Sequence, residues 1–431
     1  MNFLKKKIFL LYRYYWFKFF ISRLLFFIIF YYNYKILKKR KKNILVLSSY
    51  RFRDIENFRL LNKFSFIIIP IRVQYFLFSK YSSFMIKNKK IFFENKKKIH
   101  KELEEIDLFF HEIIFFTLRK LNIKIVLSSA AYYIQDAIFF SCFKKNKIKL
   151  IILQRENYGP QKYQTEKIKQ YFANFEPTLA DLILTQNQIT TDFMGKLLFY
   201  KKSKVSNVGT LRMDNFVKKI KNKKIKIPKR KTIIFFSFTK NVGINIQDQN
   251  ILLGANQKKG FVNLFRNSHN MVIKYAKKNP GIDLIIKHKF GGHYLEEIEE
   301  NWYKCSGESL PKNCTLTSSK NPHDLILKSN LVIAFNSTLI FESGLKDIPI
   351  VIPCFDEAAE KYRKYFDFTE LKKTCLVVNK SNFIKTIHKA LNHYNLNKTA
   401  KKGRMVMFEK YVSSTTEGSA IKISREINKI I

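Results

Sequence analysis

Cysteine is scarce in this sequence, and its spacing forms no known motif. The 431 residues include five cysteines, an odd number, and no two of them make a Cys-x-x-Cys pair. A zinc ribbon or a disulfide framework is therefore not expected, and reduced thiols of a cytosolic protein are the default. There is also no His-Glu-x-x-His run and no Asp-rich calcium loop, so neither a metal site nor a resident cofactor is expected.

Acidic residues are also few. Lys and Arg number 80 and Asp and Glu 33, which gives a formal net charge of +47. Such a charge favours polyanions, either nucleic acid or an anionic membrane face. The chain is low in Gly (13) and Pro (9) but rich in Phe (42) and Tyr (22), and Lys, Ile, Phe, Tyr and Asn share A/T-rich codons. A mutational bias accounts for much of the lysine equally well, so the charge alone identifies no partner.

The chain contains enough apolar residues to form more than one hydrophobic core. Apolar residues make up 46% and aromatics 15%, which excludes general disorder, and the length fits two or three domains of roughly 150 residues each. Over 43–215, short β-rich runs alternate with helical patterns, which predicts an α/β domain with a parallel sheet covered on both faces. Its predicted strands are Asn43–Ser49, Phe64–Pro70, Ile123–Ser129, Ile148–Gln154, Asp181–Thr185 and Lys204–Gly209.

The same alternation restarts after a basic stretch. Residues 216–231, with nine Lys or Arg within 218–231, are interpreted as a linker, and a nucleic-acid or lipid patch is the alternative. A second α/β domain is predicted over 232–400, closed by helical residues 401–431. Its predicted strands are Thr232–Ser237, Ile282–Lys287, Leu331–Phe335, Ile348–Pro353 and Cys375–Val378. The expected architecture is two doubly wound, Rossmann-like domains with a cleft between them.

Residues 1–42 form a separate aromatic and basic segment. Its apolar stretch, 8–34, is interrupted by three cations that do not share one helical face, and the uninterrupted part is too short for a roughly 20-residue span. No small-residue cleavage site follows, which argues against a secretory signal. Three interpretations fit: an interfacial anchor, a poor transmembrane helix, or an aromatic helix packed on the protein. Trp16, the tyrosines and the basic flanks favour the anchor, because they suit the headgroup region of an anionic membrane.

Ligands of such domains bind beyond the carboxyl ends of the parallel strands. In LVIAFNSTLIFESG a buried strand leads through Asn336, Ser337 and Thr338 into a helix, and free amides with two hydroxyls make an anion cradle suited to a diphosphate. Glu342, one turn further on, is placed to accept hydrogen bonds from a sugar or ribose diol. Simple helix capping by Ser or Thr with a solvated Glu is the other interpretation.

Other strand ends and helix starts supply further candidates. Lys287 and His288 end the strand IDLIIK and can neutralise phosphate, although a Lys-His-Lys run arises easily by chance in so basic a chain. His323 falls in a predicted first helical turn and fits that position better than a catalytic one. Arg155 and Arg212, which follow two strands of the first domain, and His323 of the second domain are candidates to line the cleft.

Taken in order, these segments resemble the GT-B glycosyltransferase superfamily, in particular its bacterial surface-carbohydrate and capsule branch, which is related to CDP-glycerol glycerophosphotransferases and Kdo transferases. The resemblance covers about 150–420 and is strongest at 323–353. The matching pieces are DLILTQNQITTDFM, VSNVGTLRMD, AKKNPGIDLIIKHK, HDLILKSNLVIAFNSTLIFESGLKDIPIVIP and YVSSTTEGSA.

The resemblance implies a donor nucleotide held mostly by the second domain, and transfer of a sugar or polyol phosphate. By motif position, Asn336, Ser337, Thr338 and Glu342 would bind this donor and Lys287 its phosphates. The chain departs from the retaining enzymes, because Ile350 stands eight residues after Glu342 where a second Glu is usual. It also lacks the Asp-Tyr-Ser-Ser form of the glycerophosphotransferases, so the stereochemical outcome and the donor stay open.

An inverting transfer needs a base near the acceptor, on the wall opposite the donor. Glu156 is the candidate, because it follows the strand Ile148–Gln154 and lies in a loop with Gly159 and Pro160. A salt bridge with Arg155 or a neighbouring lysine is the alternative interpretation of the same residue.

The leading function is therefore a glycosyltransferase acting on a surface polysaccharide or a lipid-linked acceptor, peripheral or monotopic at the cytoplasmic face of the cell membrane. A non-hydrolysing nucleotide-sugar epimerase shares the fold, but that class usually has Ser-Gly-Gly with paired acidic residues where this chain has Asn-Ser-Thr. A basic nucleic-acid-binding protein ranks last, because it would interleave aromatics with lysines on one exposed face. Here the aromatics fill strands and the amino-terminal segment, so no nucleic-acid partner is expected.

Overall fold

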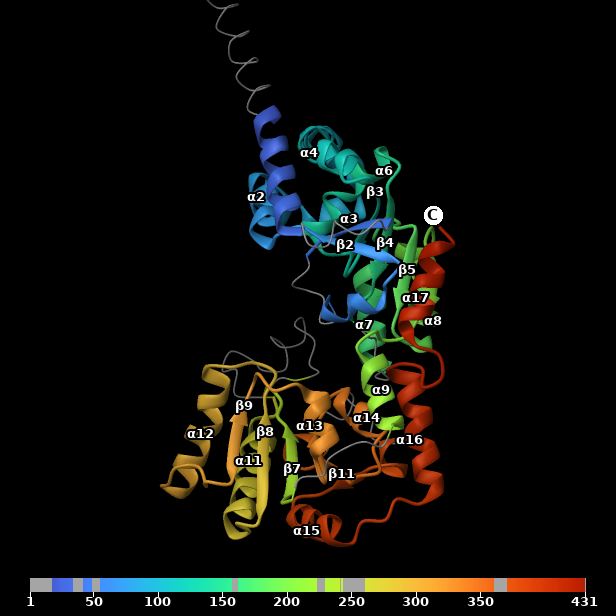
Figure 1. Cartoon of the computed structure of the whole chain (residues 1–431). Helices are drawn as coiled ribbons and strands as arrows, with labels where there is room; N and C mark the ends of the chain where they lie inside the picture. The colour runs from blue at the N-terminus through green and yellow to red at the C-terminus, as the bar shows by residue number, and fades with distance from the viewer. Residues whose placement is uncertain are drawn as a thin grey trace, which may run out of the picture. The chain divides into compact units, whose positions relative to one another are not determined.

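The computed structural model describes residues 18–33, 42–48, 55–156, 162–222, 229–240, 242, 260–359 and 370–430. The chain forms two compact units. The first comprises Met1–Asn157, Ile168–Arg212 and Thr416–Ile431, and the second comprises Tyr158–Lys167 and Met213–Thr415. Each unit has its own six-stranded sheet with helices around it (Figure 1), and the two-domain α/β fold expected from the sequence is confirmed.

The sheet of the first unit is parallel throughout, with strand order β2-β1-β3-β4-β5-β6. Its strands are β1 (Lys42–Val46), β2 (Phe64–Ile68), β3 (Ile123–Ser128), β4 (Lys149–Leu153), β5 (Leu182–Thr185) and β6 (Lys204–Asn207). The inner strands are almost wholly buried, as continuous apolar runs require when helices cover both faces. Each of the six lies within a run predicted as strand or overlaps it.

Helices of different lengths surround this sheet. They are a helix over 18–33, α2 (Ile71–Lys87), α3 (Lys89–Glu94), α4 (His100–Lys120), α5 (Ile134–Ala137), α6 (Phe140–Lys145), α8 (Gln188–Gly195) and α17 (Ser419–Asn428), with 3-10 turns at Ile55–Leu60, Lys96–Ile99 and Leu198–Tyr200. α7 (Lys162–Phe172) belongs to this unit from Ile168 onward. The last helix returns to the first unit, because Ile423 and Ile427 of α17 pack into the core beneath Ile44 and Leu182. The predicted closing segment 401–431 is thus divided between the two units.

The helix over 18–33 is packed on the first unit along one stripe. Ser22, Leu25, Ile29 and Asn33 are buried and lie three or four residues apart. Among the described residues, no helix is both long enough and apolar enough to cross a membrane. The rest of the predicted segment 1–42, including Arg13 and Trp16, lies outside the described residues except for Lys42.

The sheet of the second unit is also parallel, with strand order β12-β11-β10-β7-β8-β9. Its strands are β7 (Lys231–Phe236), β8 (Ile282–Lys287), β9 (Cys314–Thr317), β10 (Leu331–Ala334), β11 (Ile350–Pro353) and β12 (Leu376–Val378). Sequence patterns missed β9, because CTLT is short and half polar. The helices are α9 (Met213–Lys221), α11 (Val262–Lys278), α12 (His293–Ser306), α13 (Pro322–Lys328), α14 (Leu339–Ser343), α15 (Phe383–His393) and α16 (Lys398–Tyr411), with 3-10 turns at Asp356–Ala358 and Leu371–Lys373.

The predicted linker 216–231 is partly helical. Its first six residues belong to α9, and Phe216 is 1% exposed within the second unit. The last residue, Lys231, begins β7, and 223–228 lie outside the described residues. Met213, Phe216 and Ile220 have the spacing of one helical face. The segment was nevertheless predicted as a linker, because of its many lysines.

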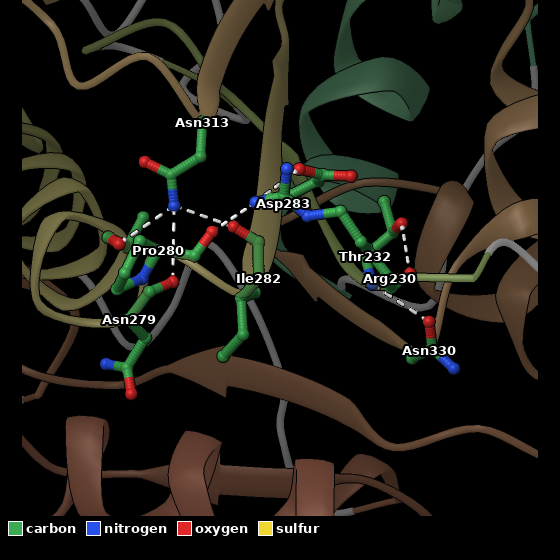
Figure 2. A network of polar contacts seen from close by, with 9 residues as sticks. Arg230, Thr232, Asn279, Pro280, Ile282, Asp283, Asn313 and Asn330 are labelled. Carbon is green, nitrogen blue, oxygen red and sulfur yellow. Dashed lines mark hydrogen bonds and ion pairs between the residues drawn. The ribbon is translucent and has the colours of Figure 1, made fainter.

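The amino-terminal edge of the second sheet is closed by side-chain amides (Figure 2). Nδ2 of Asn313 donates to the carbonyls of Ala276 and Ile282 at 2.9 and 2.6 Å, and Oδ1 of Asn330 accepts from the amide of Thr232 at 2.8 Å. Because these amides satisfy backbone groups where the strands begin, this edge is structural. A ligand is therefore expected to bind at the opposite side of the sheet, beyond the carboxyl ends of the strands.

Candidate functional site

The carboxyl edge of the second sheet contains the point where the strand order reverses. The chain runs from β7 to β8 and β9 on one side and to β10, β11 and β12 on the other, so the reversal falls between β7 and β10. Phe236 at the end of β7 is in register with Ala334 of β10 and with Lys287 of β8. The turn after Ala334 and the Lys287 side chain therefore start from strand ends about 10 Å apart along one edge.

The turn Phe335–Thr338 has the conformation of a tight strand-to-helix connection. Asn336 has φ +45°, a left-handed conformation that Asn adopts more readily than most residues. Its Nδ2 donates to the carbonyl of Val242 at 3.4 Å, and Oγ of Ser337 accepts from the amide of Leu339 at 3.3 Å. The serine hydroxyl thus partly caps α14, as the alternative interpretation of this motif held.

Glu342 is buried at the centre of a network that joins three of the predicted residues. It is 2% exposed, its Oε1 accepts from the Thr338 hydroxyl at 3.1 Å, and its Oε2 lies 2.9 Å from Nε2 of His323. The ring of His323 stacks on Phe216, with centroids 4.4 Å apart and planes at 19°. Thr338, Glu342 and His323 therefore form one hydrogen-bonded cluster. Glu342 is buried and bonded to the other two residues, so it is not solvated.

His323 occupies the predicted first turn and also has a side-chain role. Asn321 caps α13 by accepting from the amides of His323 and Asp324, with Pro322 at the first position. The side chain of His323 is 12% exposed and directed at Glu342. Phe216, which supports this ring, was missed, because its position in a lysine-rich run gave no sign of a site.

Lys287 stands at the carboxyl end of β8 but is partly engaged. Its Nζ donates to the carbonyl of Ser318 at 2.7 Å and to that of His288 at 3.0 Å. An ammonium has three N–H groups, and these contacts use two of them. Burial lowers the pKa of Lys287 from its ordinary value, because removing the charge from water disfavours the protonated form.

His288, expected to bind the donor, is turned into the protein. It is 1% exposed, its Nδ1 lies 3.0 Å from both the amide nitrogen and the carbonyl oxygen of Phe290, and its ring stacks on Tyr294 with centroids 5.0 Å apart. Burial lowers the pKa of His288, and hydrogen bonds to backbone groups of Phe290 and Phe238 offset only part of this effect. The neutral ring therefore has a structural role: it holds Phe290 and Tyr294 in the segment after β8.

Sequence reasoning missed a second buried histidine at the same edge. His269 of α11 is fully buried; its Nδ1 lies 2.6 Å from the carbonyl of Phe265 and its Nε2 lies 2.9 Å from Oγ of Ser237, directly after β7. Burial lowers the pKa of His269 to about 3, so the ring is neutral. Since a carbonyl only accepts, Nδ1 carries the proton and Nε2 accepts from the Ser237 hydroxyl.

The candidates of the first unit lie at the carboxyl ends of its strands. Glu156 has a 45% exposed side chain, and its Oε1 is 3.4 Å from Nε of Arg155. This is the salt bridge that the alternative interpretation named, and it leaves the carboxylate reachable from solvent. Nε2 of Gln186 donates to the carbonyls of Gln154 and Arg155 and so fixes the start of this loop. Arg212 is half-buried at the end of the segment Ile168–Arg212.

A buried carboxylate in the same unit also escaped prediction. Asp136 is fully buried; its Oδ1 accepts from Ser48 at 2.5 Å and from Gln74 at 2.7 Å, and its Oδ2 accepts from Ser128 at 2.7 Å. Ser48 has φ +43°. The network ties the ends of β1 and β3, which flank the reversal of strand order in this sheet. The partners of Asp136 are far apart in the sequence, so no local motif predicts this network.

No three His, Cys, Asp or Glu side chains gather as a metal site anywhere in the part of the chain that the structure describes. Comparison of the sequence with protein-family models and with curated proteins gave no match.

Solved structures do match. A Listeria monocytogenes protein assigned as a UDP-N-acetylglucosamine 2-epimerase is 13% identical, with a TM-score of 0.50 over 90% of this chain and 96% of its own. The UDP-GlcNAc 2-epimerase of Neisseria meningitidis, bound to UDP-GlcNAc, is 14% identical, with the same TM-score over 90% and 99%. The wall teichoic acid polymerase TagF gives 12% identity and a TM-score of 0.44 over 74% and 76%, too low to support an inference.

The chain has the two-domain fold of GT-B-type enzymes, as the sequence resemblance predicted. At these identities the likeness establishes the fold, and it leaves the reaction to be argued from the chain's own residues.

Proposed function

We propose that this protein is a glycosyltransferase that moves a sugar or polyol phosphate from a nucleotide-activated donor to a surface polysaccharide or a lipid-linked acceptor. The observation that carries the proposal is the grouping of Thr338, Glu342 and His323 beside the turn after β10, with Lys287 on the same edge. The diphosphate of a nucleotide is bound by cations and by hydroxyl and amide donors, and this grouping offers them.

Each residue has a separate part in the proposed reaction. Charge that develops on the leaving phosphate would be stabilised by Lys287 and by the amides of Asn336–Thr338. Glu342 would hold the Thr338 hydroxyl and the His323 ring toward the donor, since both its oxygens already bind these groups. Glu156, exposed and charged beside Arg155, would take the proton from the acceptor hydroxyl. The proposal requires no resident cofactor.

The same fold also serves nucleotide-sugar epimerases, so the reaction needs a test of its own. The Asn-Ser-Thr turn supports a transferase, because it replaces the Ser-Gly-Gly and paired acids usual in epimerases. We also place the reaction at the inner face of an anionic membrane, with no nucleic-acid partner. This placement is supported by the aromatic and basic helix over 18–33.

Two measurements on the full chain test the proposal. Thermal unfolding with UDP, GDP, CMP, CDP and their sugars will identify the donor, because a ligand that binds the native state raises its stability. The stabilising nucleotide sugar is then incubated with membrane lipid extract. A glycosyltransferase will release the free nucleotide only when extract is present. Conversion of the sugar with the nucleotide still attached would identify an epimerase, and no stabilising nucleotide would reject both activities.

A further inference from the structure

The helix over 18–33 exposes a continuous apolar surface, called here the aromatic face. Its members are Phe19, Phe20, Leu24, Phe27, Ile28, Tyr31 and Tyr32. Their exposed fractions run from 39% for Ile28 to 85% for Tyr31. Seven exposed large apolar side chains within residues 18–33 are far more than the single exposed hydrophobic residues of an ordinary surface.

The aromatic face is held in place by the opposite side of the same helix. The side-chain amide of Asn33 pairs with Ile68 at the end of the edge strand β2, donating to its carbonyl and accepting from its amide, both at 2.9 Å. Leu25 and Ile29 are 5% and 2% exposed. The ring of Phe26 packs edge-on against Phe116 of α4, and Figure 1 shows the helix beside α2 and α4. The face is thus presented by a folded helix.

Both described cations of this helix, Lys18 and Arg23, have partners within the protein. Lys18 forms an ion pair with Glu112 of α4, and its side chain is 13% exposed. The guanidinium of Arg23 lies 3.3 Å from the ring centroid of Phe19 and 4.3 Å from that of Phe116, a cation–π arrangement. Lys18 is thus neutralised by Glu112, and Arg23 lies over Phe19 at the border of the aromatic face.

The amino-terminal sequence and the neighbouring helix α2 are basic, while α4 contributes Glu112, which is paired with Lys18. The first 53 residues contain 14 Lys or Arg and no Asp or Glu. The following helix α2, which begins three residues after Ile68, has Arg72, Lys80 and Lys87 and no acidic residue, while its Tyr75, Phe76 and Ile86 are 46–65% exposed. An apolar centre with basic neighbours is complementary to the headgroup and acyl boundary of an anionic bilayer.

We propose that the aromatic face is the surface by which the folded protein docks on an anionic membrane, with the helix lying in the plane of the interface. This inference deepens the membrane placement proposed above and is independent of the donor chemistry.

The test is co-sedimentation of the full chain with vesicles of phosphatidylcholine alone and of phosphatidylcholine with phosphatidylglycerol. The test variant carries Phe20→Gln, Phe27→Gln and Tyr31→Gln. The matched control carries Leu198→Gln, Tyr303→Gln and Ile421→Gln, which are 58–63% exposed, against 62–85% for the test residues, and lie elsewhere. A second test variant, Phe27→Glu, places one carboxylate in the face. Thermal unfolding and the nucleotide-induced shift are recorded for every variant.

We expect the wild type and the control to bind anionic vesicles more tightly than neutral ones. Both test variants should lose at least about tenfold in affinity, since each lost aromatic contact removes apolar burial, while the nucleotide-induced shift stays the same. Retained vesicle binding by both variants would overturn the proposal. So would a dimer of the wild type, seen by light scattering, that the test variants abolish, because a second copy would then occupy the face. Loss of nucleotide binding with vesicle binding intact would count against the proposed enzyme alone.

Discussion

Nε2 of His323 lies 2.9 Å from Oε2 of Glu342, and both side chains are shielded from solvent, at 12% and 2% exposure. The contact joins α13 to α14 across the carboxyl edge of the second sheet. Because the carboxylate also accepts from Thr338 and the imidazole also rests on Phe216, a change at either residue reaches the turn after β10. The pair therefore connects the packing of α9 with the proposed donor site.

A double-mutant cycle on this pair should show strong coupling. We expect His323→Ala and Glu342→Gln each to cost about 1–3 kcal/mol of unfolding free energy, because each leaves a buried polar group without its partner. Each should also weaken nucleotide binding, and the double variant should lose clearly less than the sum. Denaturant unfolding and nucleotide titration measure the two effects.

The chain offers a matched control for that cycle. Lys219 and Asp324 also join α9 to α13, at 2.9 Å, but their side chains are 56% and 53% exposed. Solvent screens such a pair, so Lys219→Ala should cost at most about 1 kcal/mol and leave nucleotide affinity unchanged. Equal losses in both cycles would show that His323 and Glu342 have no special part in the site.

Lys287 should make nucleotide binding sensitive to alkaline pH. Because burial lowers its pKa, the ammonium loses its proton at a lower pH than an ordinary lysine, and its attraction for a diphosphate is lost with it. We expect affinity for the identified nucleoside diphosphate to fall as the pH rises toward about 10.4, the unperturbed lysine value. Lys287→Arg, which stays charged, should flatten the profile, whereas the neighbouring Lys289→Arg should not. An unchanged profile for Lys287→Arg would remove Lys287 from phosphate binding.

Local sequence patterns predicted every strand of the two sheets except β9, and they singled out the motif after β10. Strands such as Leu331–Ala334 and Ile350–Pro353 are continuous apolar runs, and a run buried on both faces needs no distant partner to be recognised. The Asn-Ser-Thr turn and Glu342 lie within seven residues of one another, so their proximity follows from one strand end and one helical turn.

The contacts that complete the sites depend on residues far apart in the chain. Phe216 meets His323 from 107 positions away, and Ser48 meets Asp136 from 88. His269 belongs to no local motif, and its contacts with Ser237 and Phe235 form because α11 packs against β7. Such pairs are set by tertiary packing, which a single sequence does not encode as a local pattern.

Gly292 supports the loop that follows Lys287. It has φ +60° and ψ −135° and precedes α12, a conformation that a residue with a Cβ adopts only with strain. We expect Gly292→Ala to lower the unfolding free energy by about 1–3 kcal/mol. Gly281→Ala is the control, because its Cβ would meet nothing within 4 Å and its φ is ordinary; it should be neutral or slightly stabilising. Equal effects of the two substitutions in denaturant unfolding would contradict this account.

Acid should loosen α17 from the first unit through Glu426. Burial alone would raise the pKa of this carboxyl, but the ammonium groups of Lys204 and Lys429 outweigh it and hold the pKa of Glu426 below its ordinary value. The folded form thus favours the carboxylate. Its stabilising effect is complete above the unfolded pKa of about 4.3 and is lost as the pH falls through the lower, folded value.

Thermal unfolding between neutral and acid pH measures the effect of Glu426. Glu426→Gln should destabilise the protein at neutral pH and reduce the further loss in acid. Glu308→Gln, which breaks the exposed pair with Lys277, should change neither. A wild-type acid profile for Glu426→Gln would show that this carboxyl does not govern the attachment of α17.

Glu156→Gln tests the catalytic assignment directly. The amide keeps the shape of the carboxylate but cannot take a proton, so turnover with the acceptor should fall by roughly 10²–10⁴-fold while nucleotide affinity is retained. Glu417→Gln is the matched control in the same unit, because Glu417 is 35% exposed and also paired with an arginine, Arg425, at 2.6 Å. Its loss should leave turnover unchanged. If Glu156→Gln turns over at the rate of the control, another group takes the proton. Equal losses in both variants would mean that surface arginine pairs, and not a base, determine the rate.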